Sequence, residues 1–327
     1  MELPPKKISI GILLFFASVL IVCGVYIRNS KAKIPDMEQS VDSFNSFWKK
    51  EISTKGGYIA YKEFKESNFH KKPEMQHLAA HFIGSDLYDV LGYKAITICD
   101  LSYRYGCYHG VFSSAIKEGG LSVVSKLDEK CFGGKILPTP CQHGIGHGLM
   151  EYFGEGKGAA EKSLNECSKL RFNKNYAGCS YGVFMEYELN LAESFQSVNL
   201  ISKKYSSFQI CDGFAKKRDR ESCFFTMPKW WRLFYGDSYS KIGKMCGEIS
   251  DDKACFMGLG RDILSQQNYN VRNTIVLCKK ISNSNNLVNC LSGAYLAYLN
   301  LIPNKKNFAI QLCDGLSVTG KNECLRQ

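Results

Sequence analysis

The sequence predicts an all-α protein in which one N-terminal transmembrane helix precedes a disulfide-stapled, helical-hairpin repeat domain outside the cytoplasm. Three observations lead to this prediction: an uncharged segment near the N-terminus, fourteen cysteines at alternating short and long intervals, and apolar residues at helical spacing between them. With 45% hydrophobic residues, the chain is too apolar to be disordered. The sequence contains no Walker loop, no G-x-S-x-G, no H-E-x-x-H and no C-x-x-C-H motif, so these enzyme and haem classes are not indicated.

The N-terminal segment indicates export. Residues 8–27 carry no charge and follow two lysines. Twenty helical residues rise about 30 Å, which matches the hydrocarbon core of a bilayer. Because no A-x-A-like cleavage site follows, the segment is predicted to be an uncleaved signal-anchor. Residues 1–7 would then be a cytoplasmic tip, and the bulk of the chain would be periplasmic or extracellular. Three basic residues after the span oppose this orientation, and the cysteine pattern outweighs them. They are Arg28, Lys31 and Lys33.

The cysteine spacing predicts the architecture. Fifteen cysteines without a C-x-x-C pair indicate an oxidising compartment. With Cys23 left in the predicted span, the other fourteen, taken in order as pairs, enclose 7 to 11 residues, with 22 to 31 residues between pairs. This alternation predicts seven sequential disulfides in a helical-hairpin array. The paired residues are Cys99, Cys107, Cys131, Cys141, Cys167, Cys179, Cys211, Cys223, Cys246, Cys255, Cys278, Cys290, Cys313 and Cys324.

The flanks of the cysteines repeat as well. C-x-x-G follows the second cysteine of five pairs, and a small residue there lets neighbouring backbones approach closely. The repeat domain is predicted to span residues 76–327. Residues 28–75, which lack cysteine, are predicted to form a stalk and N-terminal cap, with a helix over residues 36–52 that ends at Gly56-Gly57. The repeated glycines are Gly110, Gly144, Gly182, Gly258 and Gly293.

Five of the six histidines fall into three short motifs in the first third of this domain. They are H-x-x-x-H, C-Y-H-G and C-Q-H-G-I-G-H-G. The third residue of C-Y-H-G and of C-Q-H-G occupies the same repeat position, so packing of adjacent repeats is expected to bring these histidines together. The five are His77, His81, His109, His143 and His147.

Clustered imidazoles suit a borderline divalent metal, with zinc favoured and iron or manganese as alternatives. Two carboxylates, Glu151 and Glu186, are candidate catalytic residues, either as a further metal ligand or as a general base. Two other interpretations of the histidines stay open at this point. They are hydrogen bonding that only supports the fold, and a proton-sensing cluster.

The combination of H-x-x-x-H-x-x-G, C-Y-H-G and C-x-H-G-x-G-H-G, followed by G-V-F-M-E, resembles uncharacterised exported proteins of bacteria and archaea. The resemblance covers roughly residues 75–265. It implies that the histidines act together, and it brings no activity with it.

The sequence therefore supports three hypotheses of function. The first is a membrane-anchored, metal-dependent enzyme of hydrolytic type. The second is a binding or scaffold solenoid that docks a protein or an envelope polymer, with structural histidines. The third is a metal-sequestering protein. The net charge of +11 is compatible with an anionic polymer, and no basic run indicates nucleic acid. The adjacent Trp230 and Trp231 are interpreted as core residues, with a stacking platform as the alternative.

Overall fold

The structure is a computed structural model, and it describes residues 34–68, 73–133, 138–171, 176–195, 209–236, 238–281, 284–302 and 306–326. Every regular element in these ranges is a helix, and none is a strand, which confirms the all-α prediction. The chain divides into two units between Phe47 and Trp48. All residues discussed below as a candidate site belong to the second unit.

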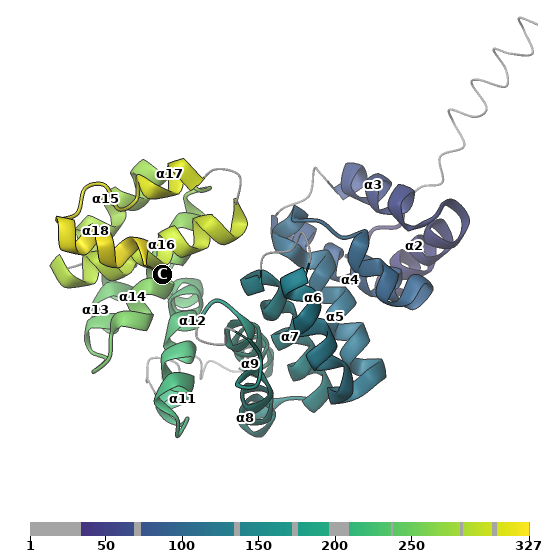
Figure 1. Cartoon of the computed structure of the whole chain (residues 1–327), viewed down its shortest axis with the longest axis horizontal. Helices are drawn as coiled ribbons and strands as arrows, with labels where there is room; N and C mark the ends of the chain where they lie inside the picture. The colour runs from purple at the N-terminus through teal and green to yellow at the C-terminus, as the bar shows by residue number, and fades with distance from the viewer. Residues whose placement is uncertain are drawn as a thin grey trace, which may run out of the picture. The chain divides into compact units, whose positions relative to one another are not determined.

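The chain colours in Figure 1 follow the helices from α2 to α18. The first ten elements are α2 (Val41–Lys55), α3 (Gly57–Asn68), α4 (Pro73–Leu91), η1 (Gly92–Thr97), η2 (Ser102–Tyr105), α5 (Gly106–Gly119), η3 (Gly120–Val123), α6 (Val124–Gly133), α7 (Pro138–Phe153) and α8 (Gly156–Cys167). The remaining described elements are α9 (Cys179–Phe195), α11 (Gln209–Asp212), α12 (Lys217–Tyr235), α13 (Tyr239–Gly247), α14 (Lys253–Gln266), α15 (Val271–Ile281), α16 (Ser284–Leu301), α17 (Lys306–Ile310) and α18 (Val318–Leu325).

The predicted cytoplasmic tip and signal-anchor, residues 1–27, lie outside the described residues. Among the helices that the structure describes, none is both long and apolar enough to cross a membrane. The helix predicted over residues 36–52 begins later, at Val41, because the Ser40 hydroxyl accepts a hydrogen bond from the Ser43 amide at 3.1 Å and caps its N-terminus. It ends at Gly56 as predicted, where φ is +83°.

The seven disulfides join the cysteines in sequential order, as the spacing predicts. Their Cα–Cα distances lie between 5.4 and 6.0 Å. Most of them tie the end of one helix to the start of the next. Cys167, for example, ends α8 and bonds Cys179, the first residue of α9. Seven disulfides indicate an oxidising, extracytoplasmic environment.

Close helix crossings at the repeated glycines build the array. The helices α4, α5, α7, α9, α12, α14 and α16 contact one another in this order. A Cβ atom on Gly110 would lie 1.9 Å from the His81 carbonyl oxygen, and one on Gly182 would lie 2.1 Å from the His143 carbonyl oxygen. Only glycine permits so close an approach. Because the backbone atoms approached belong to His81 and His143, both crossings lie at residues of the histidine motifs.

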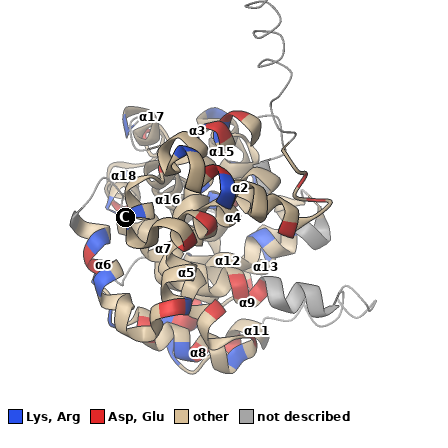
Figure 2. Cartoon of the chain, turned by 90° about the vertical axis from the view of Figure 1, so that its right-hand side faces the viewer, with Lys and Arg blue, Asp and Glu red and all other residues tan. Residues whose placement is uncertain are grey.

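The helices that flank this series carry charges of both signs. Lysines alternate with acidic residues along α6 and α8, which Figure 2 shows as mixed blue and red segments. By contrast, the helix α16 has no charged residue, and Glu151 is the single acidic or basic residue of α7. The crossing helices α7 and α16 are thus almost free of charged side chains.

Candidate metal centre

Five histidines from three consecutive crossing helices meet in one cluster. His77 and His81 lie one turn apart on α4, His109 lies on α5, and His143 and His147 lie one turn apart on α7. Ring centroids are 4.6 Å apart for His77 and His81, 4.9 Å for His81 and His109, 4.8 Å for His109 and His143, and 4.5 Å for His143 and His147. The imidazoles therefore form one continuous group.

The first three histidines have the geometry of a metal site. His77, His81 and His109 offer ligand atoms that all lie within 4.8 Å of one another. His81 Nε2 is 3.1 Å from His77 Nε2 and also 3.1 Å from His109 Nδ1. Nitrogens bound tetrahedrally to zinc at its usual bond length lie about 3.3 Å apart. The two separations from His81 are close to this value, and all ligand atoms of the group lie within 4.8 Å of one another, so the group could hold such an ion.

A second group of three shares His109 with the first. His109, His143 and His147 again offer ligand atoms within 4.8 Å of one another, and all three are buried. His143 Nε2 and His147 Nε2 are 2.9 Å apart. His77 and His81 are only partly buried, so the first group is the one that solvent reaches.

Hydrogen bonds at the two ends of the cluster fix the ring protons. The Tyr103 carbonyl can only accept, so His77 Nδ1 donates to it at 2.7 Å and leaves Nε2 with a free lone pair. His147 Nδ1 likewise donates to Glu186 Oε1 at 2.5 Å. Histidines that bind metals typically donate their second ring N–H to a carbonyl or a carboxylate in this way.

Hydrogen bonds among the rings do not satisfy the whole cluster. His109 Nε2 and His143 Nδ1 are buried without a hydrogen-bond partner in the part of the chain that the structure describes. A buried polar atom left unpaired costs about 1–3 kcal/mol. A metal bound to His109 Nδ1 leaves both atoms unpaired, so only a ligand that reaches His109 Nε2 or His143 Nδ1 would reduce this cost.

Burial keeps four of the five imidazoles neutral. It is the main reason why the pKa of His77 is lowered to about 4, and it lowers the pKa values of His81, His109 and His143 well below the ordinary range. Like charges on the neighbouring rings act in the same direction. Neutral imidazole is the form that binds metals, so these four rings are available for coordination over the physiological pH range.

A left-handed turn places the carbonyl that orients His77. Three consecutive residues of this turn have positive backbone φ angles: +53° at Tyr103, +53° at Arg104 and +66° at Tyr105. Residues other than glycine rarely adopt this conformation. Nothing in the sequence indicates it, since none of the three residues is glycine. Such strain persists only where surrounding contacts impose it, and it occurs preferentially at functional sites.

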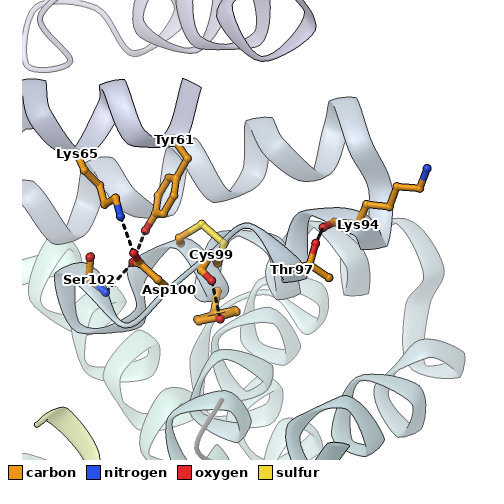
Figure 3. The surroundings of a disulfide bond; sticks show 9 residues. Tyr61, Lys65, Lys94, Thr97, Cys99, Asp100 and Ser102 are labelled. Carbon is orange, nitrogen blue, oxygen red and sulfur yellow. Dashed lines mark hydrogen bonds and ion pairs between the residues drawn. A yellow bond between two sulfur atoms is a disulfide. The ribbon is translucent and has the colours of Figure 1, made fainter. Parts of the chain in front are cut away.

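The contacts that impose this turn lie beside the first disulfide (Figure 3). Asp100, next to Cys99, accepts hydrogen bonds from the Tyr61 hydroxyl at 3.0 Å, the Lys65 ammonium at 2.6 Å and the Ser102 amide at 2.9 Å. The Tyr103 hydroxyl also donates to the Lys65 carbonyl at 2.9 Å. The helix α3 thus anchors the turn whose carbonyl holds His77.

Of the two carboxylates singled out in the sequence, the structure brings one to the cluster. Glu186 bonds His147, and 29% of its side chain is exposed. Burial raises the pKa of Glu186, but the hydrogen bond from His147 and its charge outweigh burial, so the net pKa is lowered. Glu151 is half-exposed, and its partner is Lys117 at 3.9 Å. The expectation that Glu151 shares the site is not met, since it lies in the last turn of α7, just beyond the buried segment that ends at Met150.

The structure adds two residues that the sequence reading did not assign to the site. Tyr181 occupies the histidine position in the third repeat, and its ring lies 4.8 Å from that of His143. Arg261 on α14 stacks on Tyr181, with Cζ 3.8 Å from the ring centroid. The shared repeat position was the available signal for Tyr181. Trp230 and Trp231 are buried, which favours their interpretation as core residues.

Comparisons with protein-family models, with curated proteins and with solved structures find no match to this chain. The functional argument therefore rests on the geometry and chemistry of the cluster.

Proposed function

We propose that the protein is a metal-dependent hydrolase that works outside the cytoplasm, anchored by residues 8–27, with zinc as the favoured metal. The observation that carries the proposal is the convergence of His77, His81 and His109, whose ligand atoms lie within 4.8 Å of one another, with His81 Nε2 3.1 Å from both His77 Nε2 and His109 Nδ1. Three histidines with an open fourth position are the pattern of catalytic zinc. The partial exposure of His77 and His81 supports this assignment over a closed structural site.

A divalent ion at these nitrogens would lower the pKa of a bound water towards neutrality. The residues of the chain would do the rest. Tyr103 fixes the tautomer and orientation of His77 through its carbonyl, and Glu186 does the same for His147. Because the Glu186 side chain is partly exposed and its pKa is lowered, it is an ionised acceptor for the proton of an attacking water.

The decisive experiment measures metal content. The full-length, oxidised protein is incubated with zinc, dialysed and analysed by mass spectrometry for metal per chain. His109→Ala removes the residue shared by both groups and is expected to abolish zinc retention. Met257→Ala is the matched control, because Met257 is buried and occupies the same repeat position in a later repeat. Wild-type protein without zinc, or His109→Ala protein with wild-type zinc content, would refute the metal centre.

A second measurement separates catalysis from the two alternatives. A hydrolase loses ester hydrolysis in His81→Ala while thermal unfolding changes little. A metal-sequestering protein binds zinc tightly and hydrolyses nothing. A scaffold that docks a protein or an envelope polymer keeps its binding when His143 and His147 are replaced, provided that the fold survives.

A further inference from the structure

His109 is the one histidine that both groups of three share. Its Nδ1 lies 3.1 Å from His81 Nε2, on α4. The Cδ2 side of the same ring faces α7, because a Cβ atom on Gly144 would lie 3.2 Å from His109 Cδ2. In an imidazole ring, Nε2 is bonded to Cδ2. The two nitrogens of His109 therefore lie on sides of the ring that face different groups.

A single ion in the first group would leave a buried proton on His109. A neutral imidazole carries one proton, on either Nδ1 or Nε2. When His109 Nδ1 binds the ion, that proton must be on Nε2. His109 Nε2 is buried and makes no hydrogen bond within the described part of the chain. Buried donors without an acceptor are rare and unfavourable, so the first ion alone does not satisfy this ring.

The other two histidines of the second group offer nitrogens for another ion. His147 Nδ1 donates to Glu186 Oε1, so His147 Nε2 carries a lone pair. This nitrogen lies 2.9 Å from His143 Nε2. The rings of His143 and His147 each lie 4.8 Å from the ring of His109, between centroids. The ligand atoms of the group lie within 4.8 Å of one another, so all three residues can reach one ion.

We propose that the cluster binds two divalent ions at once and that His109 bridges them, with Nδ1 on the ion of the first group and Nε2 on an ion held with His143 and His147. This inference rests on the proposed function, because it shares the first ion. When the second ion binds, its bond to Nε2 replaces the N–H bond. The proton leaves to solvent, and the bridging ring is an imidazolate. Zinc is the favoured metal at both positions, since imidazole is the ligand at both.

The two ions would have different roles. Zinc–nitrogen bonds of about 2.0 Å on both sides of one ring place the ions roughly 6 Å apart. Two ions that activate one water together lie about 3.5–4 Å apart. The second ion therefore cannot share the water of the first. It would lie deeper, since His109, His143 and His147 are 2%, 8% and 4% exposed. Its role would be to fix the ring of His109 for the first ion.

The test counts ions and measures their magnetic coupling in the full-length, oxidised protein. After zinc loading and dialysis, mass spectrometry should find two zinc ions per chain. With copper(II) instead of zinc, the saturated protein should give a weakened electron paramagnetic resonance signal per copper, because an imidazolate bridge couples the two unpaired spins. His143→Ala should hold one ion and give the full signal of isolated copper(II). Met257→Ala is the matched control and should behave as wild type, because buried Met257 occupies the same repeat position in a later repeat.

The outcomes separate this inference from the proposed function. A single zinc ion per chain that is lost in His77→Ala and kept in His143→Ala would overturn the second ion and leave the hydrolase proposal standing. A single ion that is kept in His77→Ala and lost in His143→Ala would overturn both, since the group that solvent reaches would then hold nothing. Two ions with a full, uncoupled copper signal in the wild type would overturn the bridge. The wild-type ion count and spectrum need no substitution, so they test the inference even where a variant fails to fold.

Discussion

Glu186 Oε1 lies 2.5 Å from His147 Nδ1, although 39 residues of chain separate the two. The bond crosses from α9 to α7 at the point where Gly182 lets the two helices meet. It sets the ring orientation of His147 and directs Nε2 towards His143. This contact is the clearest sign that the cluster is organised for binding rather than filled by chance.

Replacement of Glu186 by glutamine is expected to weaken zinc binding by the second group, which contains His147, about 10- to 100-fold, because Glu186 is the outer-shell partner of His147. The fold should be retained, since the amide has the same size. Competitive chelator titration measures the change. Glu151→Gln is the matched control and should bind zinc as wild type does, because Glu151 lies at the surface with Lys117. Equal losses in the two variants would contradict the role assigned to Glu186.

Alanine at position 182 tests the helix crossing. Its Cβ would lie 2.1 Å from the His143 carbonyl oxygen, so the helices must separate, at a cost of about 1–3 kcal/mol or more. The zinc affinity of the second group, which contains His143, should fall as well, because His143 moves. Gly158→Ala is the control, since a Cβ there meets nothing within 4 Å. It should raise stability by about 0.5–1 kcal/mol. Urea unfolding distinguishes the two variants. An unchanged free energy of unfolding in Gly182→Ala would show that the helices at this crossing can accept a methyl group.

The raised pKa of Asp86 predicts that the protein loses stability as the pH rises. Burial is the main cause that raises its pKa to about 7 from the usual 3.8, and its Oδ2 has no hydrogen-bond partner among the described residues. The folded state therefore holds this proton more tightly than the unfolded state, and the unfolding free energy falls between about pH 4 and 7. Asp86→Asn should remove this fall. Thermal unfolding at pH 4.5 and pH 8 measures it, and parallel curves for variant and wild type would contradict it.

The lowered pKa of Asp100 predicts a pH dependence of stability opposite to that of Asp86. Burial raises its pKa, but the hydrogen bonds from Lys65 and from the Ser102 amide outweigh burial, so the net pKa is lowered. Its contribution to stability is therefore present above the unfolded pKa and lost as the pH falls through the folded pKa. Asp100→Asn should destabilise the protein at pH 7 and have little effect in acid. The same thermal measurements check this, and a variant equally destabilised at both pH values would exclude the electrostatic explanation.

The disulfides can be tested one at a time. Replacing Cys167 and Cys179 by serine opens a loop of 11 intervening residues and should cost about 2–3 kcal/mol in the chain-entropy model. Peptide mapping without reduction should find only sequential pairs. A peptide that joins Cys107 to Cys131 would contradict the repeat.

Much of the fold was predictable because its determinants are local. The alternating cysteine intervals indicated the seven disulfides, and the C-x-x-G motif indicated where helices approach. The start of α2 was less predictable, because it depends on which of several polar residues caps the helix, and Ser40 does so. The left-handed turn at Tyr103 could not be predicted, since contacts with α3, from an earlier part of the chain, impose it.

The sequence by itself determined an all-α, disulfide-linked array in an oxidising environment and singled out five histidines as a group. It could do so because disulfide spacing and repeat position are properties of short segments. Only the tertiary structure decided that His109 belongs to two groups of three, that Glu186 and not Glu151 joins them, and that Arg261 stacks on Tyr181 beside His143. These relationships depend on how closely helices cross, and backbone contacts such as the one at Gly182 set that distance between residues far apart in the chain.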